Sequence, residues 1–159
     1  VSGVTLTNNQ VTYKSSKPSV AKIKNNVLYA KDNGSYSLTV SLNSNPALTS
    51  TESYVMSGVQ RPKANITSVK SKKKKQITVS WKNNIKNVSG YEIQYSTSKK
   101  FTKKTTKTVK TKGNKAKSKT ISKLKSKKTY YVRIRAYKNQ SQGEKFYGKY
   151  SKTLKIKVK

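Results

Sequence analysis

The sequence predicts an all-β chain made of two small modules in tandem, and three observations predict it. Apolar and polar residues alternate in short runs, the period expected of half-buried strands. Gly, Asn, Ser and Pro separate the runs, and no segment shows the period of an amphipathic helix. The density of lysine rises beyond residues 60–65, QRPKAN, which hold a proline between polar residues. We therefore place a boundary there, between modules 1–61 and 62–159.

Four short strands are expected in the first module, at residues 11–13, 27–30, 36–42 and 52–59. Each connection contains a residue that favours a turn. Pro18 fixes its own φ angle, whereas Gly34 and the pair Asn25 and Asn26 can adopt positive φ. The segment 43–50 is interpreted as a turn for the same reason.

Seven strands are expected in the second module, at residues 66–69, 76–82, 90–96, 107–110, 118–121, 129–138 and 150–159. This number in about 95 residues suits one immunoglobulin-like sandwich of two antiparallel sheets. Alternation divides the side chains of each strand between two faces. One face collects apolar residues such as Trp81, Ile93 and Val132, which are expected in the core. The other face is polar, so the lysines of these strands can lie in water.

The net charge of +33 is concentrated in the second module. Residues 1–63 hold seven basic and two acidic side chains, whereas residues 64–159 hold thirty basic and two acidic ones. Such a charge attracts polyanions in a salt-dependent manner. Only Arg61, Arg133 and Arg135 are arginine, the usual reader of base edges, so nucleic acid is expected to bind only non-specifically. Lysine in connections and edge strands also has a purely structural use, because it solvates the surface and discourages aggregation.

Several classes of function are excluded by composition. The chain has no cysteine, no histidine and one methionine, which removes thiol nucleophiles, histidine bases and the usual zinc sites. Its four carboxylates, Asp32, Glu52, Glu92 and Glu144, are spaced singly, whereas glycoside hydrolysis needs a facing pair. We expect no enzyme activity, no cofactor and no metal. No apolar run reaches the length of about 18 residues that a membrane-spanning helix needs.

The second module resembles a fibronectin type III domain of the bacterial extracellular kind. The segments that carry the likeness are ITVSWK, VSGYEIQYSTSKKF, ISKLKSKKTYYVRIRAYK and GKYSKTLKIKVK, in that order. The spacing from Leu124 to Tyr130 is similar to the tyrosine corner of that family, in which a phenolic hydroxyl bonds back to the preceding loop. The resemblance implies a seven-stranded sandwich without catalysis, used as a spacer or as a contact module. The Arg-Gly-Asp tripeptide is absent from residues 138–148, so integrin binding is not implied.

The first module resembles part of a bacterial immunoglobulin-like domain of group 2, through VTYKSSKPSVAKIKNNVLYAKDNGSYSLTV at residues 11–40. It departs from that family at Tyr13, where tryptophan is common, and the early strands are nearly missing. Both families occur in modular proteins of Gram-positive bacteria, which implies a monomeric chain that is secreted or at the cell surface. The absence of an initial methionine suggests a fragment or a mature product.

The candidate binding face is the outer face of the sheet that the family builds from its third, sixth and seventh strands. If these strands are neighbours, one aromatic and four cations project together, namely Tyr131, Arg133, Arg135, Lys155 and Lys157. The alternative is that Glu92 pairs one arginine and the other side chains are solvated. Candidate exposed aromatic residues near the last hairpin are Tyr137, Phe146 and Tyr147.

The predicted function is that of a spacer or adhesion module that contacts anionic cell-wall or host polymers, glycans or a surface protein. Two alternatives stay open at this point. One is a dedicated polyanion-binding protein, for glycan or nucleic acid. The other is an accessory module of a larger carbohydrate-active enzyme.

Overall fold

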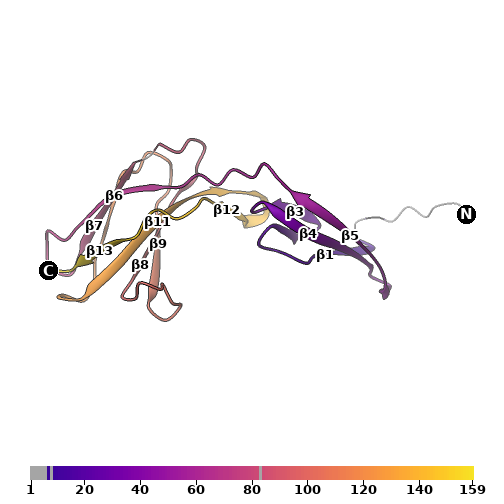
Figure 1. Cartoon of the computed structure of the whole chain (residues 1–159), viewed down its shortest axis with the longest axis horizontal. Helices are drawn as coiled ribbons and strands as arrows, with labels where there is room; N and C mark the ends of the chain where they lie inside the picture. Colours follow the sequence, from indigo (N-terminus) through magenta and orange to yellow (C-terminus); the bar gives the residue numbers. More distant parts are fainter. Residues whose placement is uncertain (1–6, 8, 83) are drawn as a thin grey trace, which may run out of the picture. The chain divides into compact units, whose positions relative to one another are not determined.

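The computed structural model describes residues 7, 9–82 and 84–159 (Figure 1). Over these residues the regular structure consists of β-strands and one short 3-10 helix, which confirms the all-β prediction. The chain divides into two compact units, residues 1–60 and 61–159. Within the described part, no helix has the length and apolar character needed to cross a membrane.

The first unit contains a three-stranded antiparallel sheet and a separate hairpin. The sheet has the order β1-β4-β5, formed by β1 (Val11–Ser15), β4 (Gly34–Leu42) and β5 (Asn45–Met56). The hairpin pairs β2 (Ala21–Lys24) with β3 (Val27–Ala30). Asn25 and Asn26 connect its strands with φ angles of 48° and 58°, as a two-residue hairpin turn with positive φ requires. Strand β2 was not predicted.

The prediction of a turn over residues 43–50 is wrong. Strand β5 already begins at Asn45 and includes Pro46, and only Asn43 and Ser44 remain between it and β4. Because β5 pairs with β4 alone, it is an edge strand of its sheet, and an edge strand tolerates proline. The pairing with β4 is irregular between Ser41 and Leu42, close to this turn.

The second unit is a sandwich of two sheets, formed by β6 (Asn65–Lys70), β7 (Ile77–Lys82), β8 (Gly90–Ser96), β9 (Thr106–Lys110), β10 (Ser118–Ile121), β11 (Thr129–Asn139), β12 (Lys145–Tyr147) and β13 (Leu154–Lys157). One sheet has the order β10-β7-β6 and the other β12-β11-β8-β9, with β13 also paired to β11. The strand expected at residues 150–159 is shorter, as β13, and β12 was not predicted; the two pair with different parts of β11. The 3-10 helix Ser141–Gly143 precedes β12.

The core of the second unit draws on both sheets. Trp81 is 3% exposed, as predicted, and its ring lies 5.4 Å from that of Tyr91. The fifteen buried side chains of this cluster include Ile77, Val79, Ile93, Val132 and Ile134. The predicted tyrosine corner is confirmed, because the Tyr130 hydroxyl accepts the backbone N–H of Lys125 at 3.2 Å. By contrast, the core of the first unit consists of Val20, Ala21 and Tyr36, with Leu38 and Met56 packed against them.

Candidate functional site

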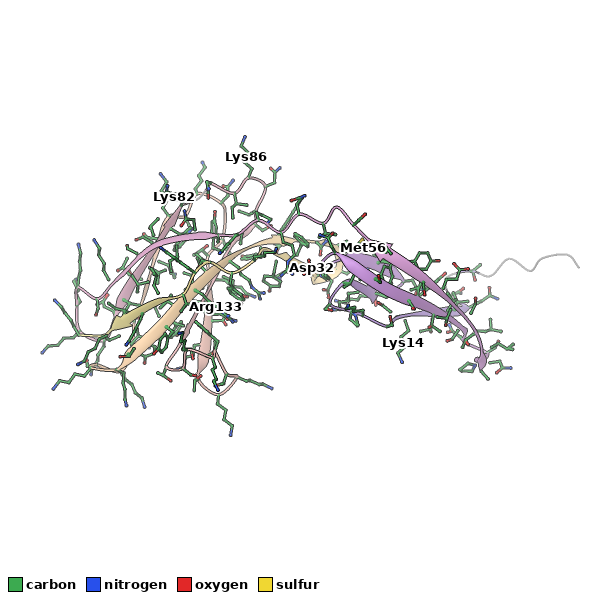
Figure 2. The ribbon with its side chains drawn as sticks, viewed as in Figure 1. Lys14, Asp32, Met56, Lys82, Lys86 and Arg133 are labelled. Atoms are coloured by element: carbon green, nitrogen blue, oxygen red, sulfur yellow. The ribbon has the colours of Figure 1, made fainter. Side chains whose placement is uncertain are left out.

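Strand pairing brings the predicted cations of the second unit onto one outer face. Arg133 lies opposite Gln94 of β8, and Arg135 lies opposite Glu92. Paired residues of antiparallel strands project to the same side, so both arginines stand beside the polar side chains of β8. Figure 2 labels Arg133 in the sheet formed by β8 and β11.

The two arginines are inserted between three aromatic rings, an arrangement that we call the arginine–aromatic stack. The Arg133 guanidinium carbon lies 4.0 Å from the ring centroids of both Phe101 and Tyr150. The Arg135 guanidinium carbon lies 4.5 Å from the Tyr150 ring and 3.7 Å from the Tyr147 ring. A cation over an aromatic face is attracted by the negative charge at that face. The order of the stack is therefore Phe101, Arg133, Tyr150, Arg135 and Tyr147.

Two nitrogen atoms of each arginine, Nε and Nη2, are engaged inside the protein. Arg135 donates from Nε to Glu92 Oε1 at 2.8 Å, and its Nη2 forms an ion pair with the same oxygen at 2.7 Å. Arg133 donates from the same two atoms to Gln94 Oε1, at 3.0 Å and 2.8 Å. The Glu92 side chain is only 5% exposed, and Lys110 Nζ lies 3.6 Å from its second oxygen. This is the alternative in which Glu92 pairs one arginine, and it commits part of the donor set of both arginines to contacts within the sheet.

Tyr150 occupies the centre of the stack and remains protonated far above neutral pH. Burial, the largest cause, and the nearby Glu92 carboxylate together raise the pKa of its hydroxyl to about 12, against the lowering effect of Arg135 and Arg133. The hydroxyl donates to Glu92 Oε1 at 3.3 Å. Tyr150 thus links the two arginines to the carboxylate that pairs with one of them.

The sequence did not reveal Phe101 or Tyr150 as members of this site. Phe101 lies in the connection between β8 and β9 with a φ of 50°, an uncommon conformation for a bulky residue. Neither position follows from the alternation within a strand, because each ring reaches the arginines from a connection. The signal available in the sequence was the pair of arginines at alternate positions of one strand, because two cations on one face favour aromatic partners.

The prediction that Tyr137 is exposed is wrong. It is 6% exposed, and its hydroxyl donates to the carbonyl oxygen of Thr111 at 2.9 Å. The ring lies over Gly90, where an added Cβ would come within 2.8 Å of the Tyr137 hydroxyl oxygen. Phe146 and Tyr147 are half-buried in β12, and Tyr147 belongs to the arginine–aromatic stack.

The remaining members of the predicted face lie towards the start of β11. Tyr131 is half-buried and pairs with Lys155, and Lys157 pairs with Thr129. Both lysines are exposed. The structure therefore separates the predicted face into an internally bonded stack and a lysine-bearing end. Among the described residues, no three acidic, histidine or cysteine side chains group as metal ligands.

Comparison with known proteins agrees with this architecture. The fibronectin type III domain family matches residues 60–148, and the hyaluronate lyase N-terminal beta-sheet domain family matches residues 5–50. The first unit is therefore similar to that N-terminal domain. Its likeness to group 2 immunoglobulin-like domains stays a prediction. No curated protein matches the chain.

Two solved structures share the fold. The crystal structure of chicken CNTN1 FN1-FN3 domains is 23% identical, with a TM-score of 0.53, and the match covers 84% of this chain and 47% of that one. The chain thus spans about half the length of that structure. The solution structure of the fn3 domain of human contactin 1 is 20% identical, with a TM-score of 0.51, covering 65% of this chain and 83% of that one. Since the first family match extends over more than half of the sequence, the chain belongs to the fibronectin type III domain family.

Proposed function

We propose that the chain is a non-catalytic accessory module of a secreted or cell-surface bacterial protein, which acts as a spacer and contacts an anionic polysaccharide. The observation that carries this proposal is the pairing of two features. The first unit matches a domain of hyaluronate lyase, a protein named for an acidic polysaccharide, and the adjoining unit carries most of the +33 charge. A polymer of negative charge is the complementary ligand.

The arrangement of charge in the second unit supports the proposal. Its apolar side chains are shared between two sheets, and nearly all of its lysines are exposed. Exposed lysines interact with a polyanion through many weak, salt-sensitive contacts. A dedicated anion reader would instead offer arginine forks, but Arg133 and Arg135 donate to Gln94 and Glu92.

A salt titration tests this function. Fluorescently labelled hyaluronan and chondroitin sulfate fragments are titrated with the chain at increasing ionic strength, with neutral dextran as the control. We expect binding to both acidic polymers at low salt, a steep loss as salt rises, and none to dextran. The variant Arg133→Met should bind as the wild type does. The proposal fails if neither acidic polymer binds at low salt, or if affinity persists at high salt and disappears in Arg133→Met.

A further inference from the structure

One end of the second unit carries a dense group of lysines, which we call the basic pole. It comprises Lys70 at the end of β6, the connection between β6 and β7, the connection between β10 and β11, and the end of the chain after Ile156. Figure 1 shows these three segments together beside the C-terminus, and Figure 2 shows nitrogen-tipped side chains spreading from this end. Its eleven lysines are all exposed, namely Lys70, Lys72, Lys73, Lys74, Lys75, Lys123, Lys125, Lys127, Lys128, Lys157 and Lys159.

Hydrogen bonds to the backbone tie the three segments into one surface. The N–H of Lys75 donates to the Lys159 oxygen at 3.0 Å, and the N–H of Leu124 donates to the Lys75 oxygen at 2.9 Å. The N–H of Lys127 donates to the Val158 oxygen at 2.8 Å. The Lys159 N–H also donates to the Ser71 hydroxyl at 3.0 Å. The lysines are therefore anchored on a fixed frame, although their side chains extend into water.

Three lysines of the pole adopt a backbone conformation that disfavours lysine. Lys75, Lys123 and Lys127 have φ angles of 57°, 58° and 59°. They are the only lysines with positive φ among the residues that the structure describes. Asparagine and glycine occupy such positions more readily, and this chain uses asparagine in that way at Asn25 and Asn87. The pole thus retains positive charge where the local backbone favours another residue.

The pole contains cations without acids or aromatic rings. Residues 70–76, 122–128 and 157–159 include no Asp, Glu, Phe, Tyr or Trp. Single-stranded nucleic acid is held by stacking of its bases on aromatic side chains, which these segments lack. Lysine acts as a point charge and suits carboxylate or sulfate groups repeated along a flexible polymer.

We infer that the basic pole is the site at which the chain takes an anionic polysaccharide, in place of the predicted face around the two arginines. This inference rests on the proposed function. It assigns the contact to the end of the sandwich where two connections and the end of the chain meet. Affinity then depends on the position of the lysines as well as on their number.

Two variants of equal charge test the location. The pole variant replaces Lys72, Lys73, Lys74, Lys125 and Lys128 with Gln. The control replaces five lysines at the opposite end of the strands with Gln, namely Lys82 at the end of β7 and Lys86, Lys112, Lys115 and Lys117 in connections. With labelled chondroitin sulfate at low salt, we expect the pole variant to lose about tenfold or more in affinity and the control less than about twofold. The salt dependence of binding should become shallower only in the pole variant. Unchanged Trp81 fluorescence verifies folding in each case.

The outcomes separate the two proposals. If the wild-type chain binds no acidic polysaccharide, the proposed function itself fails. If the wild type binds and both variants weaken equally, the function stands and the location is overturned. Tighter binding of a single-stranded oligonucleotide of the same charge overturns the assignment to a polysaccharide.

A third variant uses the strained positions. Replacing Lys75, Lys123 and Lys127 with Asn removes three charges at sites whose φ angle favours asparagine. We expect weaker polysaccharide binding together with an equal or higher Tm. Unchanged affinity in this variant overturns the inference.

Discussion

The two units of this chain are both β-rich, yet they differ in how much they bury. The second unit has a cluster of fifteen buried apolar residues between two sheets. The first has a cluster of three, with Val11 and Tyr29 buried outside it, and its edge strand β5 is exposed along almost its whole length. Because small domains bury a smaller fraction of their surface, the difference predicts that the second unit is the more stable of the two. A sheet alone does not make a stable domain, and a second layer is what supplies the core.

The substitution Trp81→Ala should have the largest effect on the difference in stability between the two units. Trp81 is 3% exposed and packs in the core, so its truncation should cost about 3–5 kcal/mol of unfolding free energy in the second unit. Calorimetry should show one transition move down strongly while the other stays in place. The matched change Tyr36→Ala in the first unit should leave the fluorescence transition of Trp81, the only tryptophan, unmoved. If either substitution shifts both transitions equally, the units do not unfold separately.

Removing one arginine from the arginine–aromatic stack should produce the next largest effect. Arg135→Met leaves the buried Glu92 carboxylate with the longer Lys110 contact and the Tyr150 hydroxyl, at a cost of about 3 kcal/mol. Arg133→Met leaves a neutral amide instead and should cost about 1 kcal/mol. Urea unfolding followed by Trp81 fluorescence measures both. Adding Glu92→Gln to Arg135→Met should restore part of the loss, and the same loss in both arginine variants would contradict the role given to the carboxylate.

A smaller loss is expected for Tyr130→Phe. The change removes the hydroxyl that accepts the N–H of Lys125, and this should cost about 1–2 kcal/mol. The same urea measurement applies. Tyr131→Phe, one position along on the outer face, is the control and should change little, because Tyr131 is half-buried and outside the core cluster.

The smallest effect at neutral pH is expected for Tyr150→Phe, whose signature lies at alkaline pH. The pKa of Tyr150 is about 12 in the folded chain, against 10.0 for an unburied tyrosine. The unfolded chain therefore loses this proton first, and the stability that depends on it is complete below pH 10 and lost as the pH rises towards 12. The tyrosinate absorbance of the wild type minus that of the variant should rise near pH 12. A rise near pH 10 would show that Tyr150 is not buried in the stack.

Much of the second unit could be predicted because its strands alternate clearly. Ile77, Val79 and Trp81 occupy alternate positions of β7 and therefore project to one face, and that face is the buried one. The arginines were placed on the correct face by the same rule. The aromatic partners of the arginines were harder to predict, because Phe101 and Tyr150 lie in connections. In a connection, the alternation of apolar and polar residues does not indicate to which side a side chain projects. Tyr137 was wrongly predicted to be exposed. Its position in the strand places it on the outer face, but contacts with Thr111 and Tyr147 cover it there.

The first unit was predicted less well, for a physical reason that Pro46 illustrates. Proline and asparagine near residues 43–46 are typical of turns, but proline also fits an edge strand that leaves one side of its backbone unpaired. Whether a strand lies at an edge is a property of the whole sheet. Local composition therefore could not distinguish the two cases.

The route of the chain through the second unit determines how it would carry mechanical tension. Strand β6 enters at Asn65, beside the end of β7, whereas the last residue, Lys159, is bonded to Lys75 and Ser71 at the other end of the strands. A pull on the two ends of the unit therefore acts along the strands, across the interstrand hydrogen bonds that join β13 to β11. Those bonds would be loaded in shear and would share the force instead of opening one by one, a useful property for a link that must resist stretching.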